Sequence, residues 1–165
     1  MRKVTIVLAA IAMMAAVTIP ANSQGLPVSR GGQMWGTFVH WLEVLPGQKY
    51  TGLVTINIDG TFRAGQVHGV WERTGFRTVI FTGLILLSDA AGNLVGLERH
   101  RAYAEFSPDF NSYKGREFAE QVTCPTPLTC PNPLDPQVTW TPAPWTGSAG
   151  VPITGARLEV VAPPK

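Results

Sequence analysis

Between residues 33 and 123, short runs of β-branched and aromatic residues alternate with turn-forming clusters, with a spacing of about ten positions that is typical of an antiparallel sandwich or barrel. Asp59-Gly60 is predicted to form a two-residue hairpin turn. No stretch beyond the N-terminal segment has the 3.6-residue period and the capping residues of a long helix. The pattern predicts seven strands, at residues 34–45, 50–58, 61–64, 67–73, 76–87, 94–106 and 112–122.

A meander of this many strands exposes two edges unless it curls shut. Gly155–Val161 is the one late segment with the pattern of a strand, and it would supply the closing strand. We therefore expect an all-β fold: a single antiparallel, up-and-down barrel of about eight strands. The length of 165 residues suits one domain, and no internal repeat is visible.

The first 23 residues have the order of a secretory signal peptide. Arg2 and Lys3 give a positive start, residues 4–19 carry no charge, and small residues follow Pro20. The apolar run of 16 residues is shorter than the roughly 20 that a membrane-spanning helix needs. We expect cleavage, with an uncleaved anchor as the alternative. The product is an exported domain at residues 24–165, periplasmic or extracellular, with no membrane span.

Residues 124–146 differ in composition from the rest of the chain, because ten of the 14 prolines lie from Pro125 onward. Proline lacks the donor that a sheet ladder needs, so this segment is not a central strand. Cys124 and Cys130 are predicted to form a disulfide, since exported thiols pair in an oxidising compartment. A metal site is the alternative, but two cysteines do not complete a tetrahedral shell. The segment is expected to be a pinned excursion from the barrel or a flexible linker.

Charge and motifs exclude several classes of function. The chain has 13 Lys+Arg and 11 Asp+Glu, and loss of Arg2 and Lys3 with the signal leaves 11 of each. A neutral protein has no basic patch for nucleic acid and no attraction to anionic membranes. The motifs G-x-S-x-G and H-E-x-x-H and the phosphate and dinucleotide loops are absent, so no cofactor is expected.

The chain contains the segments NIDGTF (57–62), GVWERTGFRT (69–78), SDAAGNLVGLERHRA (88–102) and YKG (113–115). They resemble a family of small, largely uncharacterised exported bacterial proteins, whose members carry "F..DGTF", "G.W.R.G" and "D..G.L.G..R.R". The family is similar to the calycin-type barrels, lipocalin-like or allene-oxide-cyclase-like. The resemblance implies a barrel fold and carries over no catalytic residue. The triplet Gly69-Val70-Trp71 also matches the lipocalin G-x-W pattern.

Strand alternation indicates which polar residues share a face. His68 and Glu72 lie on one face of their strand, and Glu98 and His100 on one face of another. If all four point into the barrel, two imidazoles and two carboxylates could perform acid–base catalysis or bind a divalent metal. If they point outward, they are surface charges. His40, between Val39 and Trp41, is expected to be a packing or surface residue.

Aromatic residues on the predicted strands are candidates for lining a ligand cavity, because an eight-stranded barrel can hold one small ligand. Packing in the core is their alternative role. The ligand-binding candidates are Trp71, Phe81, Tyr103 and Phe106.

Three functions remain open. The sequence favours binding of a small apolar ligand in the barrel, an inference that rests on fold analogy. The alternative is a barrel enzyme, an isomerase or cyclase that uses histidine and glutamate. A structural or protein-interaction module, with the Trp/Pro-rich segment as its contact surface, is the third.

Overall fold

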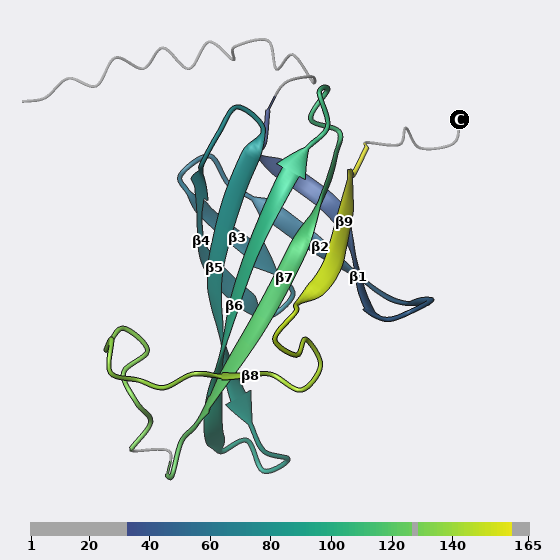
Figure 1. Ribbon diagram of the computed structural model, residues 1–165. Helices are drawn as coiled ribbons and strands as arrows, with labels where there is room; N and C mark the ends of the chain where they lie inside the picture. The colour runs from purple at the N-terminus through teal and green to yellow at the C-terminus, as the bar shows by residue number, and fades with distance from the viewer. Residues whose placement is uncertain (1–32, 127–128, 160–165) are drawn as a thin grey trace, which may run out of the picture.

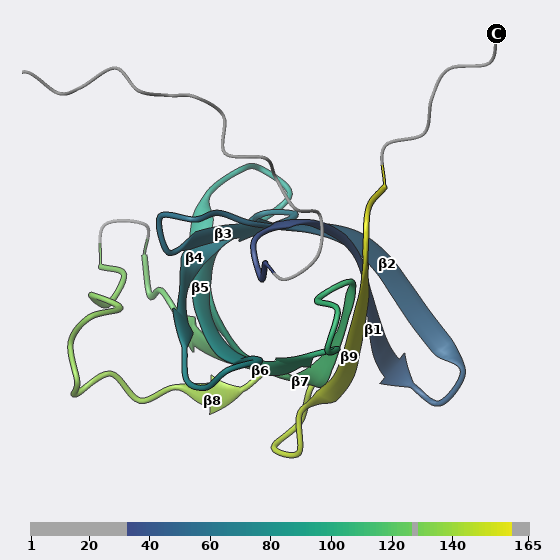
Figure 2. The same ribbon diagram turned by 90° about the horizontal axis from the view of Figure 1, so that it is seen from above.

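The computed structural model describes residues 33–126 and 129–159, and the predicted signal peptide lies outside this part of the chain. The described fold is all-β, and its strands form one closed antiparallel barrel (Figures 1 and 2). The described residues contain no helix long and apolar enough to cross a membrane. The strands are β1 (Gly36–Leu45), β2 (Gln48–Ile56), β3 (Thr61–Ala64), β4 (Val67–Arg73), β5 (Thr78–Ser88), β6 (Leu94–Phe106), β7 (Ser112–Thr123), β8 (Thr141–Pro142) and β9 (Val151–Arg157).

Eight of these strands form the barrel wall, as the sequence pattern predicted. β1 to β7 pair in chain order, and β9 closes the wall between β7 and β1. The two-residue β8 is an extra strand on the edge of β7. The closing strand was predicted at Gly155–Val161 but begins at Val151. Pro152 is tolerated because only β7 pairs with it, and pairing with β1 begins at Ile153.

The β2–β3 turn differs from the predicted type. A two-residue hairpin turn needs positive φ at both central residues. Only Gly60, at φ 85°, meets this requirement, since Phe110 is the one described non-glycine residue with positive φ. The turn instead spans Asn57–Gly60, and the Gly60 N–H donates to the Asn57 carbonyl at 3.4 Å. Asp59 uses its carboxylate to accept from the Thr61 N–H at 2.9 Å.

One end of the barrel is filled by a tightly packed aromatic cluster. Phe38 is fully buried, and its ring meets those of Phe106 and Tyr113 with centroids 5.6 and 5.4 Å apart. Phe110 and Met34 complete this plug, both almost inaccessible to solvent. Edge-on aromatic packing of this kind stabilises a core beyond the area it buries. The plug therefore fixes the shape of this half of the barrel.

The proline-rich segment leaves the wall after β7 and runs along the outside of the barrel (Figure 1). Cys124 and Cys130 form the disulfide at its start. Further on, the guanidinium of Arg99 stacks over the ring of Trp140, 4.4 Å from its centroid. The hydroxyl of Thr146, itself buried, donates to the Ala119 carbonyl at 3.1 Å. These contacts attach the segment to β6 and β7.

Replacing Phe38 by Ala should lower the free energy of unfolding by about 3–5 kcal/mol, because the plug cannot collapse around the lost ring. Phe76→Ala is the matched control, since Phe76 is 76% exposed. We expect the control to change stability by no more than about 0.5 kcal/mol. Urea denaturation measures both. Equal small losses would contradict the role of the plug.

Candidate functional site

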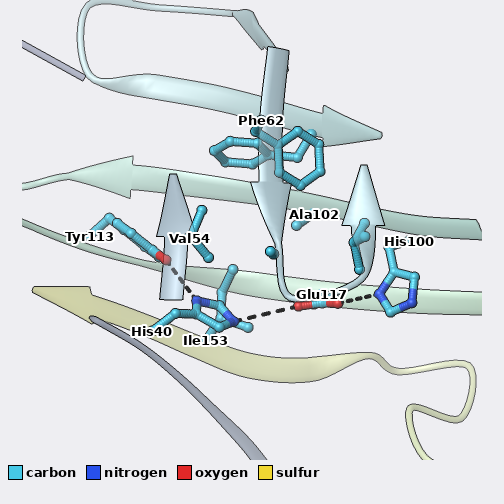
Figure 3. A pocket seen from close by; sticks show the side chains of 11 residues that line it. His40, Val54, Phe62, His100, Ala102, Tyr113, Glu117 and Ile153 are labelled. Atoms are coloured by element: carbon cyan, nitrogen blue, oxygen red, sulfur yellow. Dashed lines mark hydrogen bonds and ion pairs between the residues drawn. The ribbon is translucent and has the colours of Figure 1, made fainter. Parts of the chain in front are cut away.

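The other half of the barrel is hollow. Its cavity has room for on the order of three water molecules. The walls are mainly apolar, with a few polar side chains on one side (Figure 3). The lining consists of His40, Val54, Phe62, Ala64, Val67, Phe81, His100, Ala102, Tyr113, Glu117 and Ile153.

The polar side chains come from β1, β6 and β7, and strand register brings them together. On β6 the even-numbered positions face inward, and on β7 the odd-numbered ones do. Ala102 pairs with Glu117 across the two strands, and His100 pairs with Ala119. Glu117 therefore lies diagonally opposite His100 on the inner face, within reach of its ring. His40 points inward from β1 on the other side of β9.

His100 lies between two carboxylates. Its Nδ1 is 2.6 Å from Oε1 of Glu117, and its Nε2 is 2.7 Å from Oε1 of Glu98. The Glu98 oxygen lies off the direction of the Nε2–H bond, so this second contact is an ion pair rather than a hydrogen bond. The imidazole is about 90% buried. A protonated ring with a carboxylate on each side satisfies this arrangement.

The pKa values follow from that geometry. Burial alone would lower the pKa of His100, but the contacts with Glu117 and Glu98 outweigh it and raise the value to about 9. Burial likewise works against ionisation of Glu117, and the hydrogen bond from His100 and the approach of His40 lower its pKa to about 2. Glu98 follows the same logic, and its pKa is also lowered. At neutral pH the three groups are all ionised.

His40 and Tyr113 continue this series of polar contacts on the far side of Glu117 from His100. The Tyr113 hydroxyl lies 2.7 Å from Nδ1 of His40. Burial and the charge of Glu117 raise the pKa of Tyr113, so the phenol keeps its proton and donates it to Nδ1, its one partner among the described residues. The His40 proton is then on Nε2, which faces Oε2 of Glu117 at 3.8 Å. That separation is too long for a hydrogen bond.

Trp145 of the external segment contacts the Glu98 end of the same series of polar side chains. Its indole N–H donates to Oε2 of Glu98 at 3.3 Å, and Gln121 donates to the same oxygen. The Trp145 ring lies 5.7 Å from that of His100, centroid to centroid. A shallow hollow beside it is lined by Leu42, Val44, Tyr50 and Trp145. Leu42 follows His40 by two residues on the same face of β1, so this hollow lies beside the position of His40, and we call it the mouth.

Of the four predicted catalytic residues, the structure brings only two together. Glu98 and His100 are buried on the inner face and contact each other. His68 and Glu72 are exposed on the outer face of β4, which corrects the grouping of all four. The reason is the packing at Gly69, which lies on the opposite face of β4 from His68 and Glu72. The Phe62 ring packs directly against Gly69, where a Cβ would lie 2.6 Å from that ring. The alternate residues Val67, Gly69 and Trp71 therefore face the core.

The four aromatic ligand-binding candidates lie in different parts of the structure, and only one of them lines the cavity. Phe81 lines the cavity, its ring edge-on to Phe62 at 5.1 Å. Phe106 belongs to the plug at the other end. Trp71 packs against the core and donates its indole N–H to the Asn57 carbonyl at 2.8 Å. Tyr103 is half exposed on the outer face of β6, because Ala102 and Ala104 take the inward positions.

Sequence reasoning missed His40, Tyr113 and Glu117 as site residues. His40 was expected to pack or to lie on the surface, and its burial at 6% exposure agrees with packing alone. A signal was present at Tyr113 and Glu117, which alternate with Gly115 and Ala119 on one face of their strand. The pairing of this face with His40 could not be found locally, since 73 residues separate His40 from Tyr113.

The described residues hold no group of three or more His, Cys, Asp or Glu side chains that could bind a metal ion. The protonated ring of His100 has no lone pair to offer, since both nitrogens face carboxylates. Comparisons with protein-family models, curated proteins and solved structures found no match to this chain.

Stability should depend on pH through this cluster. The pKa of His100 is raised from 6.5 to about 9, so its stabilisation is complete below pH 6.5 and is lost as pH rises through 9. We expect the free energy of unfolding to fall over this window by up to about 3 kcal/mol. Chemical denaturation from pH 6 to 10 measures the loss. His100→Gln should be less stable at pH 6 and should lack this decline; a wild-type profile that is flat from pH 6.5 to 9 would contradict the ion pairs.

Proposed function

We propose that the barrel binds a small, largely apolar molecule in its hollow half. The observation that carries the proposal is the unequal filling of the barrel. Phe38, Phe106 and Phe110 plug one end, whereas Ala64 and Ala102 leave space at the other. An apolar cavity with a few convergent polar groups is the usual form of a small-molecule site.

The dimensions limit the ligand. The cavity has room for on the order of three waters, so only a group of a few heavy atoms fits inside it. A longer ligand would extend through the mouth, past Leu42, Tyr50 and Trp145. Its enclosed part would contact Val54, Phe62 and Phe81, and its polar group would face His40 and Glu117.

Catalysis by acid–base chemistry is the second candidate. The orientation of His40 favours it, since a hydroxyl, an imidazole and a carboxylate follow one another in the order of a catalytic triad, with the Tyr113 hydroxyl as the group that His40 could deprotonate. The pKa values of His100 and Glu117 argue against catalysis. The pKa of His100 is raised to about 9 and that of Glu117 lowered to about 2, so neither exchanges protons readily near neutrality. Binding is therefore the better supported function.

The setting of this function is an exported protein of the calycin-barrel type. The Cys124–Cys130 disulfide is compatible with an oxidising compartment, and the closed eight-stranded barrel is compatible with the family resemblance.

Native mass spectrometry of protein purified from the organism that encodes it tests the proposal. We expect an additional mass from a bound small molecule, which dissociates on unfolding. Ala102→Leu fills the cavity and should abolish the additional mass, whereas Tyr103→Leu, on the outer face of the same strand, should retain it. A mass equal to that of the chain alone, or an additional mass that Ala102→Leu leaves unchanged, would oppose the proposal.

A further inference from the structure

The charges in the hollow half of the barrel do not balance. Glu98 and Glu117 are two negative charges, and His100 between them is one positive charge. His40 is turned toward Tyr113 through Nδ1, and its Nε2 lies 3.8 Å from Oε2 of Glu117, beyond hydrogen-bond distance. The N–H groups of Gln121 and Trp145 stabilise the charge of Glu98 without cancelling it. Glu98, His100 and Glu117 together keep a net charge of about −1.

No other basic side chain of the described barrel interior compensates this charge. Arg157 also points inward, but it lies four residues beyond Ile153 on β9, on the order of 13 Å along the strand. There its guanidinium stacks on Phe38 and donates to the carbonyls of Trp35 and Phe110. Arg99 and Arg101 face outward, and both pair with Glu120. The negative charge beside the cavity is therefore local.

Oε2 of Glu117 is the carboxylate oxygen that presents negative charge to the cavity. Oε1 of Glu117 accepts from His100, but Oε2 accepts no hydrogen bond from any described residue. The Glu117 side chain is 13% exposed and lines the cavity. A carboxylate oxygen buried without a donor is costly, and a ligand that supplies a charged donor removes that cost.

The opposite wall suits the same ligand. Phe62 lies across the cavity from Glu117 (Figure 3), with Phe81 packed against it edge-on. Aromatic faces attract cations as well as alkyl groups. An anion would instead meet the net negative charge, and a neutral molecule would leave that charge uncompensated.

We propose that the ligand is a small organic amine, bound as its ammonium ion with the charged nitrogen on Oε2 of Glu117 and its alkyl part against Phe62 and Phe81. This inference rests on the proposed binding function and adds the chemical class of the ligand. The ammonium ion donates to Oε2 of Glu117, which accepts no hydrogen bond from a described residue, and offsets the negative charge of the ion-paired groups. No covalent step is involved.

The test compares three probes of nearly equal size: n-propylammonium, 1-propanol and propionate. Each is titrated at pH 7 while the methyl NMR signals of Val54 and Val67, which line the cavity, are followed. We expect n-propylammonium to bind at least tenfold more tightly than 1-propanol, and propionate to cause no shift. The wild-type protein alone decides the sign of the preference, so the test does not depend on any variant that fails to fold.

Variants then locate the charge. Glu117→Gln keeps an acceptor for His100 but removes the charge, and it should reduce the preference for n-propylammonium over 1-propanol to less than threefold. Glu120→Gln, an outward-facing carboxylate on the same strand, is the matched control and should keep the full preference. A preference that survives Glu117→Gln in folded protein would overturn the assigned oxygen.

The outcomes separate the two proposals. Equal binding of n-propylammonium and 1-propanol, or tighter binding of 1-propanol or propionate, would overturn the amine assignment and leave a binding barrel. If none of the three probes shifts the cavity signals, the binding function itself fails, and the amine assignment fails with it.

Discussion

The ion pairs of His100 with Glu98 and Glu117 connect the parts of this protein. Two carboxylates buried in an apolar barrel are stable only because one imidazolium lies between them. Through Tyr113 and His40 the cluster adjoins the aromatic plug, since Tyr113 packs on Phe38 with centroids 5.4 Å apart. Through Glu98 it holds Trp145 of the external segment at the mouth. Loss of the imidazolium would leave two buried like charges facing each other, a change that costs several kcal/mol in buried ion pairs.

The distribution of large and small side chains determines which half of the barrel is hollow. At the plug, inward positions hold Phe38 and Phe106. In the hollow half, Ala64 and Ala102 occupy inward positions of the wall, and glycine at Gly69 lets the Phe62 ring lie against the backbone. The polar cluster lies along the remaining side, on β1, β6 and β7. Charge and space therefore occur together, which is the arrangement that a ligand site needs.

The fold could be predicted from the sequence because its signals are local. Alternation and turn residues between Gly36 and Thr123 define the strands, and the need to close a sheet with two free edges predicts the barrel. The closing strand was misplaced by four residues, since it was predicted to begin at Gly155 and begins at Val151. β9 can begin before Pro152 because that proline pairs with β7 only, and the pairing with β1 begins at Ile153. This register is set by the neighbouring strands and not by the local sequence.

The site could be predicted only in part, because alternation separates two faces without saying which is inside. Glu98 and His100 share a strand with Ala102 and Ala104, and they face inward. His68 shows the same kind of alternation, yet it faces outward because Gly69 must approach Phe62. The contacts of His40 with Tyr113 and Glu117 depend on closure of the barrel through β9, which joins distant parts of the chain.

The protonation state of His100 is the most direct test of this account. ¹⁵N NMR of the imidazole ring in the folded protein, followed from pH 5 to pH 10, reports the protons on Nδ1 and Nε2 separately. The ion pairs with Glu98 and Glu117 predict that both nitrogens stay protonated through neutral pH and titrate at a pKa of about 9. A ring that loses a proton near its ordinary value of 6.5 would show that the two carboxylates do not hold it, and would contradict the account.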